Sequence, residues 1–80
     1  MIQKQIGKRI KEIRLKRKLS QEDFALNCGL NRTYLGSVER GERNISVVNL
    51  NKICLSFKIS LKEFFDSDIF RIDRGISNDN

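Results

Sequence analysis

Four small or apolar residues stand at fixed intervals in the middle of this chain and restrict how it can fold. Counted from Gln21 as the first position, the fifth, ninth, fifteenth and eighteenth residues are Ala25, Gly29, Leu35 and Val38. Ala25 allows two helices to cross closely, and Gly29 supplies the left-handed conformation of a tight turn. Leu35 and Val38 then hold the second helix against the first. This spacing predicts a helix-turn-helix, two helices joined by a turn of about three to four residues.

Capping residues indicate where these two helices begin and end. Ser20 is a predicted N-cap with acidic residues in the first turn after it, although Asp23 stands where a capping box needs Glu or Gln. Gly29 ends this helix. Asn31 is the next predicted cap, and its helix is predicted over residues 32–40.

Apolar periodicity predicts three further helices. The first is predicted over residues 3–18, with Leu15 exposed on the face opposite an isoleucine stripe. Ser46 caps a fourth helix, and Ser60-x-x-Glu63 is a capping box for a short fifth helix. The residues predicted to face the core are Ile2, Ile6, Ile10 and Ile13 in the first helix, Phe24, Ala25 and Cys28 in the second, Leu35 and Val38 in the third, and Val47, Leu50, Ile53, Cys54 and Phe57 in the fourth. The fifth helix contains Leu61, Phe64 and Phe65.

The predicted fold class is therefore all-α, with five helices in one small domain. Eighty residues provide room for one core. Residues 1–66 form the helix-turn-helix domain, and residues 67–80 form a C-terminal tail whose end, from residue 75, is expected to fray because the apolar pattern stops.

Composition argues against several classes of function. No apolar run approaches the roughly 18 residues of a membrane span, and the charged N-terminus precedes no apolar signal segment, so we expect a cytoplasmic protein. The chain has no His, which removes the usual general base and argues against an enzyme. Two cysteines cannot supply the ligands of a zinc site, so Cys28 and Cys54 are interpreted as buried thiols, with a disulfide as the alternative. We expect no metal, cofactor or small-molecule ligand.

Positive charge is concentrated at the N-terminus. The net charge is +6: residues 1–19 carry +7, from eight basic side chains and one acidic one, and residues 20–80 carry −1. This distribution favours an anionic partner, and the polar outer face of the third helix favours DNA. A solvated basic helix face is the alternative. A membrane surface is disfavoured because the core needs the apolar stripe, and RNA because only Tyr34 is a candidate for stacking on bases.

Several short segments resemble a known family of regulators. Residues 19–25 (Leu-Ser-Gln-Glu-Asp-Phe-Ala) resemble the opening of the Xre/Cro/CI-type helix-turn-helix regulators. Residues 31–35 (Asn-Arg-Thr-Tyr-Leu), 38–41 (Val-Glu-Arg-Gly) and 43–46 (Arg-Asn-Ile-Ser) are similar to the controller proteins of restriction–modification systems. The resemblance spans residues 6–66 and implies a five-helix, lambda-repressor-like DNA-binding domain.

The resemblance also implies partners and a mode of action. It implies a homodimer that binds a palindromic operator in double-stranded DNA and regulates its own gene and the endonuclease gene. Activation is implied at low occupancy and repression at high occupancy, with RNA polymerase as a candidate further partner. A phage- or plasmid-type repressor and an antitoxin whose main partner is a protein keep the same fold, and they stay open as alternatives.

The same resemblance assigns residues to the DNA contact. Arg32 and Thr33 correspond to the family's base-reading pair, and an Arg fork can donate to guanine O6 and N7 while a Thr methyl meets the thymine methyl. Ser37 lies one turn further on and is a further candidate. Contacts to the backbone or groove edge are expected from Gln21, Tyr34, Arg43, Asn44 and Asn49. The alternatives are Tyr34 as a core residue, Asn44 as a turn residue and Arg32 as a solvated charge.

Three other positions follow from the resemblance. Arg14 and Glu39 correspond to a structural ion pair that ties the first helix to the third, so neither is expected to contact DNA. Gly36 departs from the family, where Ser is common, and costs the helix about 1 kcal/mol relative to Ala.

The fifth helix carries more large apolar residues than its own core needs, and the resemblance places the family's dimer contact there. The predicted dimer-interface residues are Ile59, Leu61, Phe64 and Phe65, with Phe70 as a further candidate. Packing of these side chains inside the monomer core is the alternative.

Overall fold

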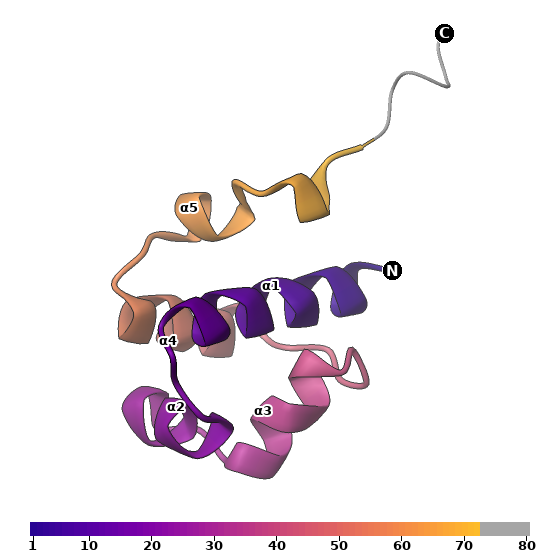
Figure 1. Ribbon diagram of the computed structural model, residues 1–80. Helices are drawn as coiled ribbons and strands as arrows, with labels where there is room; N and C mark the ends of the chain where they lie inside the picture. The colour runs from indigo at the N-terminus through magenta and orange to yellow at the C-terminus, as the bar shows by residue number, and fades with distance from the viewer. Residues whose placement is uncertain (73–80) are drawn as a thin grey trace, which may run out of the picture.

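The computed structural model of the chain describes residues 1–72 and is all-helical over that range (Figure 1). Its elements are α1 (Ile2–Lys16), α2 (Gln21–Cys28), α3 (Arg32–Glu39), α4 (Val47–Phe57), α5 (Leu61–Phe65) and the short 3-10 helix η1 (Asp68–Phe70). The predicted all-α class with five α-helices is confirmed, and no strand occurs among residues 1–72. The end predicted to fray, residues 75–80, lies outside the described residues.

The predicted caps begin four of the helices. The capping side chains, each of which accepts a backbone N–H, are Ser20, Asn31, Ser46 and Ser60. Only Ser60 forms a full capping box, in which the Glu63 carboxylate accepts the Ser60 N–H in return. Gly29 ends α2 in the left-handed conformation, with φ of 69°. Each such N-cap stabilises its helix by about 1 kcal/mol, so these short helices are specified locally.

The core lies where α1, α2, α3, α4 and α5 meet. Its buried apolar residues are Ile10, Ile13, Phe24, Ala25, Cys28, Leu35, Val38, Leu50, Ile53, Cys54, Phe57 and Phe64. Two inward predictions were wrong: Val47 is 72% exposed and Ile2 is 54% exposed. Both are the first residues of their helices, and neither belongs to the core or packs against it. Leu15 is exposed, as predicted.

Close packing between α1 and α3 depends on Gly7 in the middle of α1. A Cβ atom on Gly7 would overlap the carbonyl oxygens of Val38 and Glu39 at the end of α3. Nearby, Gly41 has φ of 76°, and a Cβ atom there would overlap Lys4. The two glycines therefore allow the backbone of α1 to cross the end of α3 directly.

The C-terminal elements are held to α1 by polar side chains. Arg9 donates from Nε to the Phe64 carbonyl at 2.7 Å and from Nη2 to the Glu63 carbonyl at 2.9 Å. Gln5 donates to the Ile69 carbonyl at 2.9 Å, which ties down η1. In Figure 1, α5 and η1 lie on the opposite side of α1 from α2 and α3.

The two cysteines are free and buried, and burial raises the pKa of both thiols. The interpretation of Cys28 and Cys54 as small hydrophobic residues is therefore confirmed. Among residues 1–72, no helix is both long and apolar enough to cross a membrane. The same part of the chain contains no cluster of His, Cys, Asp and Glu side chains suited to holding a metal ion.

Candidate nucleic-acid interface

The N-terminal turn of α3 is open to solvent. Arg32 and Thr33 are its first two residues, and both are exposed. The Asn31 side chain accepts the Tyr34 N–H at 3.0 Å, which fixes the start of the helix directly behind them. A long cationic side chain and a methyl-bearing one therefore project from a capped helix end, a geometry suited to reading base edges. Base contact by these two residues stays a prediction.

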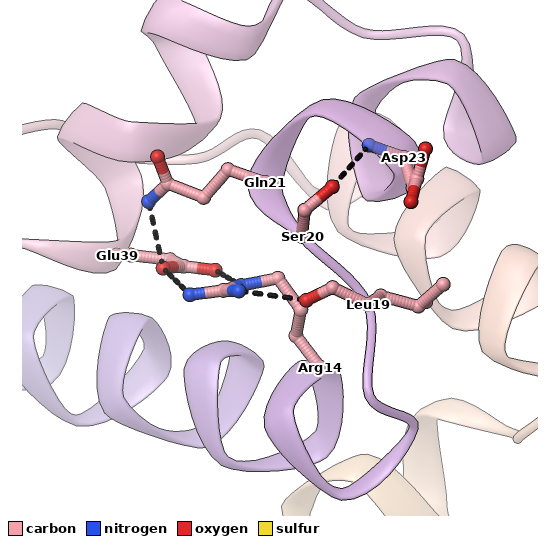
Figure 2. Close-up of polar contacts among 6 residues, drawn as sticks. All are labelled: Arg14, Leu19, Ser20, Gln21, Asp23 and Glu39. Carbon is pink, nitrogen blue, oxygen red and sulfur yellow. Dashed lines mark hydrogen bonds and ion pairs between the residues drawn. The ribbon is translucent and has the colours of Figure 1, made fainter.

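The other end of α3 is anchored by a buried ion pair (Figure 2). Arg14 donates from Nε to Glu39 Oε2 at 2.7 Å and from Nη2 to Glu39 Oε1 at 3.1 Å. Its Nη1 donates to the Leu19 carbonyl at 2.8 Å. The Arg14 and Glu39 side chains are only 9% and 3% exposed. The structure therefore contains the ion pair between α1 and α3 that the resemblance implies.

Gln21 joins this anchor. Figure 2 shows its amide reaching across to α3, where Nε2 donates to Glu39 Oε1 at 3.1 Å. A Gln amide carries two N–H donors, so one remains for a phosphate oxygen. Gln21 is half-buried at the start of α2, and its predicted backbone contact would come from a side chain already fixed in place.

Tyr34 brings together three predicted contact residues. Its ring is half-buried and packs against the core, so the core interpretation holds for the body of the side chain. Its hydroxyl accepts a hydrogen bond from Asn49 Nδ2 at 3.2 Å, and the Arg43 guanidinium carbon lies 5.8 Å from the ring centroid. Residues from α3, the following loop and the start of α4 thus form one polar surface patch.

The other two candidates beside this patch differ in how free their side chains are. Ser37 is half-buried and its hydroxyl donates to the Tyr34 carbonyl at 2.6 Å, so it can only accept from a ligand. Asn44 is exposed in the loop after α3. In that loop Arg40 donates to Glu42 at 3.0 Å, and this hydrogen bond lowers the pKa of the Glu42 carboxyl.

Comparison with known proteins assigns the chain to a family. The helix-turn-helix family matches residues 10–64, which is more than half of the chain. The chain belongs to the helix-turn-helix family. Control protein C.MunI of Mycoplasma sp is 50% identical over 64 residues, which cover 79% of this chain and 85% of that protein.

Two solved structures of controller proteins share the fold. The restriction–modification controller protein C.AhdI from Aeromonas hydrophila is 43% identical with a TM-score of 0.75, over 79% of this chain and 96% of that one. C.Esp1396I, solved as a tetramer with its natural 35 base-pair operator, is 34% identical with a TM-score of 0.77, over 81% and 86% of the two chains. The chain is thus a helix-turn-helix regulator of transcription similar to restriction–modification controllers.

The predicted dimer residues of this helix-turn-helix domain require one correction. Phe64 has no exposed surface, because it packs inside the monomer core beneath α5, so a second chain cannot touch it. Phe65 is 40% exposed and lies 4.9 Å from the Phe70 ring, centroid to centroid. Ile59 and Leu61 are half-buried beside the core. The apolar surface around α5 and η1 therefore consists of Ile59, Leu61, Phe65 and Phe70, and Phe64 lies buried beneath it.

Proposed function

We propose that this chain is a controller protein of a restriction–modification system that binds a palindromic operator as a homodimer. The proposal rests on one observation, the difference between the exposed N-terminal end and the anchored C-terminal end of α3. Its N-terminal turn presents Arg32 and Thr33 to solvent, while Glu39 at its other end is locked to α1 and α2. A recognition helix needs this combination, since it must enter the major groove without moving relative to the rest of the domain.

Each part of the interface has a distinct task in this proposal. Arg32 donates a bidentate pair to guanine, and the Thr33 methyl packs on a thymine methyl, so these two residues carry base preference. The patch around Tyr34 sets the depth and register of α3 through phosphate contacts. The residues proposed to contact the backbone or groove edge are Gln21, Tyr34, Ser37, Arg43, Asn44 and Asn49.

Dimer formation follows from the small reach of one recognition helix. A single helix reads only a few base pairs, so two copies on half-sites about 34–36 Å apart give usable specificity. Ile59, Leu61, Phe65 and Phe70 form an apolar surface. α5 and η1, which carry the last three of these residues, lie on the opposite side of α1 from α3 (Figure 1). The tetramer of C.Esp1396I on its operator supports an oligomer on DNA.

The function is tested by fluorescence anisotropy on a duplex from upstream of the chain's own gene and on a scrambled duplex, at two salt concentrations. We expect a preference of about a thousandfold or more for the upstream duplex, and an affinity that falls as salt rises. Equal, strongly salt-dependent binding to both duplexes would contradict specific autoregulation and direct the search to a protein partner.

The dimer surface is tested separately by sedimentation of Phe65→Asp. A buried charge at the proposed interface should give a monomer that binds the operator weakly and without cooperativity. Lys62→Asp, a charge change at an exposed neighbour on α5, serves as the control for folding of the domain. A Phe65→Asp protein that stays dimeric would place the interface elsewhere.

A further inference from the structure

A row of lysines covers a face of α1 that the proposed operator contact does not use. Lys4, Lys8 and Lys11 follow one another at intervals of four and three residues, so they share one side of the helix with the exposed Leu15. Lys18 follows just beyond the helix end and is also exposed. We call Lys4, Lys8, Lys11 and Lys18 the lysine face.

The lysine face carries positive charge without a partner in the described part of the chain. The ion pairs among residues 1–72 use Arg9, Arg14, Arg40 and Arg71, and none uses a lysine. The one acidic residue of α1, Glu12, is bonded to Arg9 at 2.7 Å. Like charges three and four residues apart destabilise a helix, so this arrangement works against the stability of α1. An external polyanion would relieve that repulsion.

The lysine face starts next to the recognition helix. Lys4 packs against Gly41, in the turn that follows α3, so closely that a Cβ atom on Gly41 would overlap it. Arg43, exposed in the loop that follows, adds a positive charge that has no ion-pair partner among residues 1–72, whereas Arg40 is paired with Glu42 at 3.0 Å. The positive surface therefore runs from the end of α3 onto α1, away from the outward N-terminal turn that carries Arg32.

We propose that the lysine face binds the phosphate backbone of DNA outside the half-site that α3 reads, without base preference. The proposal rests on the proposed function, because the operator is its reference ligand. Lysine ammonium groups suit this task, since they act as point charges that displace condensed counterions. A lipid surface fits less well, because Ile6, Ile10 and Ile13 are turned inward and leave Leu15 as the apolar residue of this face.

The DNA bound by the lysine face is either the flank of the same operator or a second duplex. Binding assays on a double variant and on its control distinguish these two sources. Lys8→Gln/Lys11→Gln removes two charges from the lysine face, and Lys52→Gln/Lys58→Asn removes two exposed lysines from α4 and its C-cap. Asn is chosen at Lys58 because that residue has φ of 59°, which Asn tolerates. Each protein is titrated by anisotropy on the operator alone and on the operator with scrambled flanks, over a series of salt concentrations.

If the flank is the ligand, the flanked duplex binds the wild type more tightly and with a steeper salt dependence. The slope of log affinity against log salt should then fall by about 2 in Lys8→Gln/Lys11→Gln, close to 0.9 per lost phosphate contact. The control should keep the wild-type slope, and all three proteins should prefer the short operator to its scramble by the same factor.

If a second duplex is the ligand, flanks change nothing, but operator-saturated wild type captures a labelled scrambled duplex and Lys8→Gln/Lys11→Gln does not. The proposal is overturned if the lysine-face variant matches the control in both assays. It is also overturned if only anionic phosphatidylserine vesicles distinguish the two variants. If the wild-type protein binds the operator and its scramble equally, the proposed function is contradicted. That result differs from the results that overturn the lysine-face proposal, so the two can be told apart.

Discussion

The two ends of α3 are built in opposite ways. At the C-terminal end, Glu39 pairs with Arg14 almost out of contact with water, and the last carbonyls of the helix pack on Gly7. At the N-terminal end, Arg32 and Thr33 are exposed. A side chain that reads bases must be open to its ligand while its backbone stays in place. The anchored end supplies the rigidity that the open end needs.

Two neighbouring ion pairs show how sharply this anchoring stops. The side chains of Arg14 and Glu39 are 9% and 3% exposed, whereas those of Arg40 and Glu42 are both 58% exposed. The first pair excludes water and holds two helices together, and the second is a local contact in a solvated turn. Exposed pairs of this kind contribute little to stability, because solvent screens them. The comparison therefore predicts very different responses to removal of one carboxylate.

The largest effect is expected from Glu39→Ala, which leaves the Arg14 guanidinium buried without its partner. Removing one partner of a buried ion pair typically costs about 3–5 kcal/mol of unfolding free energy. Urea denaturation followed by circular dichroism measures this loss. Glu42→Ala is the matched control, and its midpoint should equal that of the wild type. Equal midpoints for the two variants would mean that Glu39 does not anchor α3.

Gly7→Ala should be the next most damaging change. The added methyl group would overlap two carbonyl oxygens of α3, and backbone atoms cannot move aside as a flexible side chain can. Overpacking of this kind costs about 1–3 kcal/mol, more than the gain in helix propensity from replacing Gly. Lys8→Ala places an alanine at the exposed neighbouring position, and its midpoint should not fall, because the change adds helix propensity and relieves repulsion among the lysines of α1. A Gly7→Ala midpoint in urea at or above that of the wild type would disprove the close crossing.

Local signals explain why so much of the fold could be predicted from the sequence. Each cap needs only a residue and its neighbours within one turn, so Ser20, Asn31, Ser46 and Ser60 were all identified correctly. The contacts that the sequence did not indicate join distant segments. Nothing within one turn of Arg9 indicates that it donates to carbonyls of α5, more than fifty residues away. The isolated glycine in the helical pattern of residues 3–18 is a sequence signal that could have indicated the close packing at Gly7.

The candidate site also contains residues that local signals place and contacts that depend on packing between distant segments. The exposed positions of α3 follow from helical periodicity and the turn at Gly29, so Arg32 and Thr33 could be placed in advance. The hydrogen bond from Gln21 to Glu39 could not, because it depends on how α2 crosses α3. Phe64 was assigned to the dimer surface because the sequence pattern of an apolar residue is the same whether its side chain faces its own core or a second chain. Only packing distinguishes the two.

At the open end of α3, Arg32→Ala should leave stability unchanged and alter DNA recognition. The side chain is exposed, so its loss removes no packing. Loss of a bidentate contact to guanine should weaken operator binding by about 1–3 kcal/mol and relax the preference at one base pair of each half-site. Competition titrations against operators substituted at single positions measure this. An equal loss of affinity on every sequence would show that Arg32 contacts only the backbone.

Gly36→Ala tests the boundary between the two ends and should have the smallest effect. Gly36 is buried, and a Cβ atom there would lie 3.3 Å from Nη1 of Arg40 and 3.6 Å from Oε1 of Gln21. Arg40 is long and exposed and can shift by a few tenths of an ångström, so the gain in helix propensity should prevail, raising stability by about 0.5–1 kcal/mol. Because the methyl group points toward α2, operator affinity should stay at the wild-type value. A large loss of affinity with intact stability would mean instead that DNA approaches the backbone of α3 at Gly36.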